Sequence, residues 1–129
     1  MIKFLRQLIP DRHPIRLLYH KTMAVIAATM YGFPSKSLHV IGVTGTKGKT
    51  TTTNLIANVL HEAGYRVGLT STTNFRVADR SWVNETKMTT LSPFFIQKTL
   101  REMVSSRCQF AVLEVSSHAL IQNRVWGIN

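Results

Sequence analysis

The stretch LHVIGVTGTKGKTTTT, residues Leu38 to Thr53, decides the fold of this chain. Val40 and Ile41 belong to a β-branched apolar run that predicts a short buried strand. Gly45 and Gly48 follow where the backbone must turn tightly or approach a ligand closely, and the Lys–Thr pair after them is expected to open a helix. A strand, a glycine turn and a helix in this order indicate a phosphate-binding loop.

The residue types of this loop suit a nucleotide. Glycines let successive backbone N–H groups converge on phosphate oxygens, and the start of the following helix adds positive potential. Lys49 is expected to reach the β- and γ-phosphates, and the Thr50 hydroxyl to ligate Mg²⁺. The general pattern GxxxxGK[ST] requires glycine where this chain has Val43, so the loop is a variant, and the alternative is a Gly/Thr-rich surface turn. The residues expected to bind ATP are Gly45, Thr46, Lys47, Gly48, Lys49, Thr50 and Thr51.

Composition limits the class of protein. A chain of 129 residues can form one modest domain, and its net charge of +10 suits anionic partners without choosing among nucleotides, nucleic acid and lipid. Cys108 is the single cysteine, which excludes an intrachain disulfide and a thiolate metal cluster and is best explained as a small buried hydrophobic residue. No apolar run is long enough to cross a bilayer, and the start of the chain lacks the features of a signal peptide. We therefore expect a cytoplasmic protein.

Residues 1 to 37 form a basic segment that is expected to be helical. Pro14 suits the first turn of a helix through about Met30, and Gly32 and Pro34 are a stop signal after it.

This segment has six basic residues and one acidic residue, which leaves two interpretations open. A basic amphipathic helix can lie on an anionic membrane surface, which would give a peripheral membrane contact. The favoured interpretation is that its apolar residues pack on the following domain while the charges are solvated. Those apolar residues are Leu17, Leu18, Val25 and Ile26.

A helix and a second strand are expected after the phosphate loop. The helix is predicted from Thr51 to Ala63, ended by Gly64, and the strand from Tyr65 to Thr70. His61 on this helix is expected to be exposed or packed rather than a metal ligand. The apolar residues expected on one face of the helix are Leu55, Ile56, Val59 and Leu60.

The next segment is rich in hydroxyl side chains and then alternates. Residues 70 to 75, TSTTNF, follow the second strand at the sheet edge where α/β proteins bind ligands. The pattern from Phe75 to Val83, around Ala78 and Asp79, predicts a hairpin in which Trp82 is a packing anchor or a stacking surface.

A further helix and strand complete the pattern. Ser92 as N-cap predicts a helix from Pro93 to about Ser106, and the hydroxyls of Thr89 and Thr90 ahead of it either face an anion or act as caps.

The apolar run from Phe110 to Leu113 predicts a buried strand that delivers Glu114 at its carboxyl end. Beside a phosphate loop, this carboxylate is the expected second anchor for Mg²⁺. These elements together predict an α/β fold: a three-layer αβα arrangement with a mostly parallel sheet, preceded by the short helical segment.

Two ordered motifs resemble the Mur ligase family, the ATP-dependent enzymes that add amino acids to peptidoglycan precursors and include relatives acting on folate. The loop TGTKGKTTT has the form found in this family. The run EVSSHALIQNRV, Glu114 to Val125, resembles a segment of the members that add the third peptide residue, and Thr89–Thr90 resembles their TTP segment. The resemblance covers about residues 38 to 129, which we expect to be the amino-terminal part of the central ATP-binding domain.

The resemblance implies roles for particular residues. Lys49 and Glu114 would be catalytic, with ATP and Mg²⁺ held by Lys49, Thr50 and Glu114. His118 belongs to the motif without an assigned role. The residues that would contact a UDP-muramoyl-peptide-like substrate are Thr89, Thr90, Ser116, Gln122 and Arg124.

The resemblance also implies a reaction. A substrate carboxylate attacks the γ-phosphate of ATP, and the amine of an amino acid then attacks the acyl phosphate to give an amide. No nucleic-acid partner is expected. Alternatives are a ligase for another carboxylate, folyl or poly-γ-glutamyl, and a nucleotide-binding chain without turnover.

Two differences from the family are visible. Only about 37 residues precede the loop where members carry a uridine-nucleotide domain, and the segments expected after Asn129 are missing. We therefore expect a fragment that does not ligate by itself.

Overall fold

A computed structural model describes residues 13–86 and 92–128 of the chain. It alternates helices and strands, as the sequence predicts. The elements in chain order are α2 (Pro14–Met30), η1 (Pro34–Ser37), β1 (His39–Val43), α3 (Lys49–Glu62), β2 (Val67–Thr70), β3 (Asn74–Val77), β4 (Arg80–Val83), α4 (Pro93–Ser105), β5 (Phe110–Glu114) and α5 (Ser117–Ile121).

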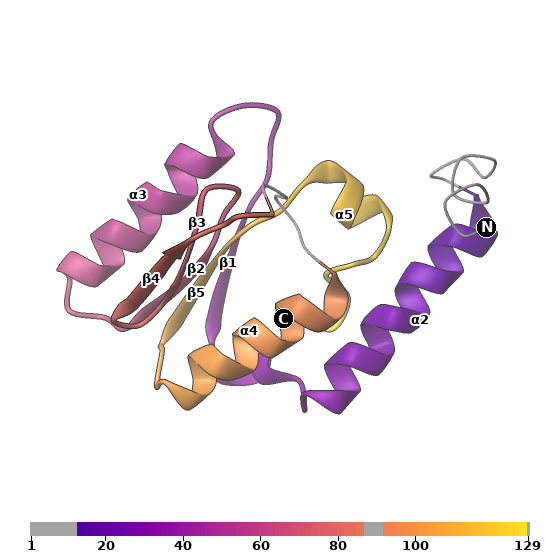
Figure 1. Cartoon of the computed structure of the whole chain (residues 1–129), viewed down its shortest axis with the longest axis horizontal. Coiled ribbons are helices and arrows are strands. Elements are labelled where there is room, and N and C mark those ends of the chain that lie inside the picture. Colours follow the sequence, from indigo (N-terminus) through magenta and orange to yellow (C-terminus); the bar gives the residue numbers. More distant parts are fainter. Residues whose placement is uncertain (1–12, 87–91, 129) are drawn as a thin grey trace.

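The five strands form one sheet in the order β1-β5-β2-β3-β4 (Figure 1). β5 runs parallel to both of its neighbours, with Glu114 opposite Val43 of β1 and Leu113 opposite Thr70 of β2. The β3–β4 hairpin adds two antiparallel pairings, so the sheet is mixed beyond its parallel core. Because β1, β5 and β2 are parallel, their carboxyl ends meet at the same edge of the sheet.

Helices cover both faces of the sheet, which confirms the predicted three-layer arrangement (Figure 1). On one face, Ala57 of α3 packs with Leu69 and Val112. On the other face, Leu100 and Met103 of α4 pack with neighbours that include Ala111 and Leu113 of β5. Successive residues of a strand point to opposite faces, which explains why β5 contributes to both clusters.

The cap signals in the sequence identify the helix starts correctly. The Ser92 hydroxyl accepts a hydrogen bond from the backbone N–H of Phe95, and Pro93 and Pro14 each begin a helix. The expected hairpin is also present, with Ala78 in a left-handed conformation at its turn.

Trp82 packs against the buried Phe75, with ring centroids 5.7 Å apart. This contact agrees with a packing role, and the Trp82 side chain is also 38 % exposed.

The expected packing face of α2 is wrong in part. Leu18 and Ile26 are exposed, whereas the buried residues of α2 are Ala24, Ala27 and Ala28. α2 packs on α4 rather than forming part of the layer on the sheet, and the alanines allow the two helices to approach closely.

The packing face of α3 also differs from the prediction. Ile56 and Leu60 pack against the core as predicted. Leu55 and Val59 are exposed, however, and the fully buried residues of the helix are Thr53 and Ala57. Thr53 tolerates burial because its hydroxyl donates to the Lys49 carbonyl one turn earlier.

Candidate functional site

The phosphate loop connects β1 to α3 and is exposed from Thr44 to Gly48. Gly48 has a φ of 77° and Gly45 a φ of 147°, values that side-chain-bearing residues rarely adopt. Lys49 is the first residue of α3, and its Nζ donates to the Gly45 carbonyl oxygen at 3.0 Å. The loop therefore presents backbone N–H groups and a lysine at the start of a helix, an arrangement suited to phosphate.

Glu114 lies directly beside this loop. It is the last residue of β5, two positions after Val112, so its side chain points to the face that α3 covers. The Thr50 hydroxyl is 3.0 Å from each oxygen of the Glu114 carboxylate, which is only 3 % exposed. The structure thus brings together the two residues that the sequence predicts as Mg²⁺ ligands.

Thr72 is a member of this cluster that the sequence analysis did not select. It follows β2, and its backbone N–H donates to Glu114 Oε2 at 2.8 Å while its hydroxyl donates to Oε1 at 3.1 Å. The signal that could have found it was the run of hydroxyl residues from position 70 to 75, at the sheet edge where ligands bind.

Two asparagines connect the turn that carries Thr72 to α3. Asn54 Nδ2 donates to the Thr50 carbonyl at 2.9 Å, and Asn74 Nδ2 donates to Asn54 Oδ1 at 3.1 Å. The fully buried Ser71 binds Asn74 in turn, with 2.7 Å between Ser71 Oγ and Asn74 Oδ1. This chain of hydrogen bonds fixes the turn relative to the phosphate loop.

The oxygen atoms at this site fit Mg²⁺. Mg²⁺ prefers oxygen ligands and is commonly held by one or two protein groups together with substrate phosphates and water. Among the described residues, the partners of the Glu114 carboxylate are hydroxyl and amide donors, and none is a cation. A buried carboxylate without a positive partner is well suited to receive a metal ion. The described residues contain no group of three or more His, Cys, Asp and Glu that could hold a metal.

The residues expected to contact the substrate lie in two separate segments of the chain. Thr89 and Thr90 lie outside the described residues. Ser116 follows Glu114 by two positions at the same sheet edge, where its hydroxyl caps α5 by accepting from Ala119 N–H at 3.2 Å.

Gln122 and Arg124 follow α5. Gln122 is buried, and its Oε1 has no hydrogen-bond partner in the part of the chain that the structure describes. His118 is exposed on α5.

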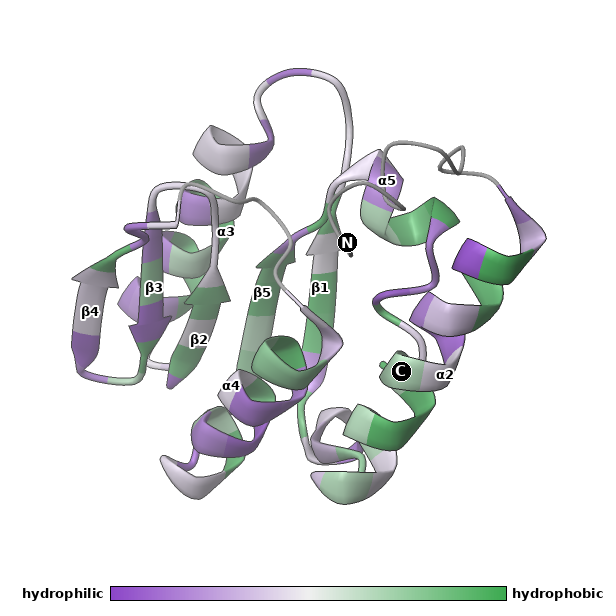
Figure 2. Ribbon diagram, turned by 45° about the vertical axis from the view of Figure 1, so that its right-hand side comes forward, coloured by the Kyte–Doolittle hydropathy of each residue, from purple (hydrophilic) through white to green (hydrophobic). Residues whose placement is uncertain are grey.

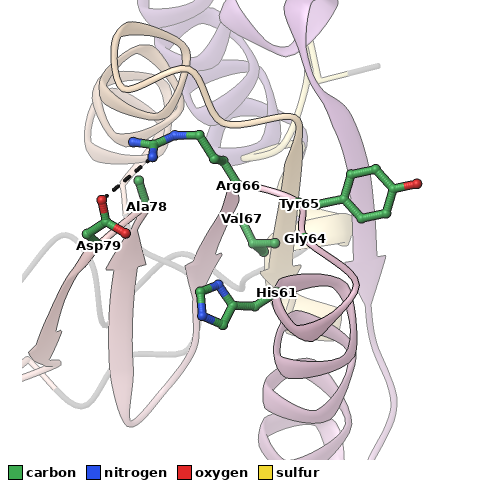
Figure 3. Close-up of a pocket in the computed structure, with 7 residues that line it drawn as sticks. All are labelled: His61, Gly64, Tyr65, Arg66, Val67, Ala78 and Asp79. Carbon is green, nitrogen blue, oxygen red and sulfur yellow. Dashed lines mark ion pairs between the residues drawn. The ribbon is translucent and has the colours of Figure 1, made fainter.

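A small pocket of about 180 Å³ lies at the other end of the molecule (Figure 3). It is formed where α3 ends and β2 begins, and an ion pair between Arg66 and Asp79, 3.6 Å apart, borders it. β2 begins at the sheet edge opposite the phosphate loop, so this pocket is separate from the loop and Glu114. The lining residues are His61, Gly64, Tyr65, Arg66, Val67, Ala78 and Asp79.

Cys108 is buried beside α4 and β5, and burial raises the pKa of its thiol above the ordinary value. The thiol therefore stays protonated and serves in the core, as the sequence indicates.

The fold and the site define a class: an α/β protein with a phosphate loop after its first sheet strand and an acidic residue at the end of the neighbouring parallel strand. Within that class the chain belongs to the Mur ligase family, because residues 43–129 match the model of the Mur ligase middle domain. The resemblance seen in the motifs is thereby confirmed.

Named relatives agree with this assignment. The chain is 46 % identical over 109 residues to UDP-N-acetylmuramoyl-L-alanyl-D-glutamate--2,6-diaminopimelate ligase of Geobacillus thermodenitrificans, covering 83 % of this chain and 22 % of the relative. It is 41 % identical over 98 residues to UDP-N-acetylmuramyl-tripeptide synthetase of a Roseiflexus species, covering 76 % of this chain and 19 % of the relative.

A solved structure of a UDP-N-acetylmuramoyl-L-alanyl-D-glutamate--2,6-diaminopimelate ligase also resembles this chain. The two superpose with a TM-score of 0.62 at 34 % identity, over 70 % of this chain and 18 % of the other. The chain thus spans about a fifth of the length of these relatives.

Proposed function

We propose that this chain binds Mg·ATP between the phosphate loop and Glu114, as part of a ligase that adds an amino acid to a UDP-N-acetylmuramoyl-peptide precursor. The observation that carries the proposal is the contact between the Thr50 hydroxyl and the buried Glu114 carboxylate, 3.0 Å apart. It places an acidic group next to the residue that a phosphate loop uses for Mg²⁺.

Each residue of the site has a distinct task in this proposal. Lys49 would exchange its contact with the Gly45 carbonyl for the β- and γ-phosphates, and Thr50 and Glu114 would hold the metal ion. Thr72 would orient the Glu114 carboxylate through its two hydrogen bonds. When bound, Mg²⁺ would offset the negative charge of the phosphate oxygens.

The ligation reaction is proposed for the whole protein, since the chain spans about a fifth of its relatives. A carboxylate of the precursor would attack the γ-phosphorus, forming an acyl phosphate and releasing ADP. The amine of the amino acid would then attack the acyl carbon, forming the amide and releasing phosphate. Lys49 would stabilise the charge that develops on the transferred phosphoryl group.

The names of the relatives guide the choice of substrates. Two of the three reported above are 2,6-diaminopimelate ligases, and all three are named for UDP-N-acetylmuramoyl or UDP-N-acetylmuramyl compounds. We therefore place diaminopimelate first among the amino acids to test, and the muramoyl precursor ahead of a folyl or poly-γ-glutamyl carboxylate.

Calorimetric titration with Mg·ATP tests the binding step. Lys49→Ala should weaken binding by about tenfold or more, because a phosphate contact by a charged group contributes about 1.5–3 kcal/mol. Lys98→Ala removes the same charge from an exposed position on α4 and should bind as the wild type does. Equal affinities for Lys49→Ala and the wild type would overturn the proposal.

A further inference from the structure

The large apolar side chains of α2 point outward rather than into the protein. Ile15, Leu18 and Met30 are each about 65 % exposed, and Tyr19 and Ile26 are also exposed. Their spacing along the helix places them on one side, which we call the outer face of α2. Figure 2 shows hydrophobic residues along α2, beside the layers that contain the sheet.

The polar residues on the outer face are already satisfied. Thr22 and Thr29 lie among the apolar residues, and their hydroxyls donate to the carbonyls of Leu18 and Val25, each at 2.8 Å. Each hydroxyl donor therefore keeps its partner on entering an apolar medium, which lowers the cost of burying these two polar groups.

Charge identifies the chemistry of the partner. Helix α2 carries Arg16 and Lys21 and no acidic residue, and Lys36 follows it in a chain with a net charge of +10. A second copy of the chain would bring an equally basic helix and repel the first. An anionic lipid surface instead attracts the basic side chains while it accepts the apolar ones.

We propose that the outer face of α2 docks on an anionic membrane surface. Ile15, Leu18 and Ile26 enter the boundary between headgroups and acyl chains, and Tyr19 occupies the interface that favours aromatic side chains with a polar tip. The helix lies on the bilayer and does not cross it; no helix in residues 13–86 and 92–128 is long and apolar enough to span one. None of these α2 residues belongs to the phosphate loop or contacts Glu114, so the docking does not depend on nucleotide binding.

Vesicle co-sedimentation of the full 129-residue chain tests the proposal. The probes are vesicles of phosphatidylcholine alone and of phosphatidylcholine with phosphatidylglycerol. We expect the chain to bind the anionic vesicles. The double variant Leu18→Ser, Ile26→Ser should bind them at least about tenfold more weakly, since burial of apolar side chains supplies part of the affinity.

A matched control separates the outer face from general charge attraction. Leu55→Ser, Val59→Ser replaces two exposed apolar residues of α3 and, like the first variant, leaves the net charge unchanged. This control should bind as the wild type does. The proposal would be overturned if the Leu18→Ser, Ile26→Ser variant bound anionic vesicles as well as the wild type does, or if both variants lost binding equally. It would also be overturned if the wild type bound neutral vesicles as well as anionic ones, or if the chain formed a dimer in solution that the α2 variant abolished.

Discussion

At the scale of single residues, the Glu114 carboxylate is the centre of the site. It is buried, and its partners are the Thr50 hydroxyl and both the N–H and the hydroxyl of Thr72. These donors hold the carboxylate in one orientation before any ligand arrives, which lowers the cost of ordering it when the ligand binds.

Replacing Thr72 by valine should weaken Mg·ATP binding several-fold. The variant keeps the side-chain shape and the backbone N–H at 2.8 Å but loses the hydroxyl that donates to Oε1, a hydrogen bond of about 1 kcal/mol. Calorimetry measures the change, with Thr52→Val at an exposed position of α3 as the control. An unchanged affinity in Thr72→Val would exclude a positioning role for the hydroxyl.

Cys108 should make the stability of the protein depend on pH in the alkaline range. Burial raises the pKa of the folded thiol above its value in the unfolded chain, so the unfolded chain loses this proton first and stability falls as pH rises through the alkaline range. Urea unfolding of the wild type and of Cys108→Ala over a range of pH measures this contribution. The other titratable groups are present in both proteins, so the difference between the two isolates the thiol. Between neutral pH and about pH 10, the unfolding free energy of the wild type should fall relative to that of Cys108→Ala. A constant difference between the two proteins would show that burial does not hold the proton.

The sequence predicts single residues of the site unevenly. Thr50 and Glu114 each belong to a local pattern, a loop before a helix and an acid after a buried strand, so both could be predicted. Thr72 meets Glu114 only because β2 and β5 pair with Thr70 opposite Leu113. That register joins positions far apart in the chain, and local patterns contain no information about it.

At the scale of elements, the close contact between β2 and α4 depends on a glycine. A Cβ on Gly68 would clash with the sulfur of Met103, which is fully buried. Gly42 in the edge strand β1 has no such neighbour within 4 Å.

Gly68→Ala should therefore destabilise the protein by about 1–3 kcal/mol, the usual cost of overpacking a core. Gly42→Ala makes the same chemical change in open space and should alter stability far less. Urea unfolding compares the two, and an equal effect in both variants would show that Met103 repacks without strain.

The starts of helices are predictable from sequence, but their packing faces are less so. Ser92 and the prolines mark helix starts through local geometry. On α2 and α3, however, alanine and threonine form part of the buried face while Leu18, Leu55 and Val59 are exposed. A hydrophobic pattern identifies large apolar residues, whereas close contact between elements selects small ones.

At the scale of the whole molecule, strand order creates the site. β1 and β5 are neighbours, so the phosphate loop after β1 and Glu114 at the end of β5 meet at one sheet edge (Figure 1). The alternation of helices and strands predicts the three layers. It does not predict that the fifth strand inserts between the first and second, because that order depends on contacts across the complete sheet.

The dependence of ATP affinity on Mg²⁺ tests the central claim most directly. Calorimetry with ATP in Mg²⁺ and in EDTA should show that Mg²⁺ raises the affinity of the wild type by about tenfold or more, and that of folded Glu114→Gln by less than about threefold. If Glu114→Gln gains as much affinity from Mg²⁺ as the wild type does, the ion is not held at Glu114 and the account of the site is contradicted.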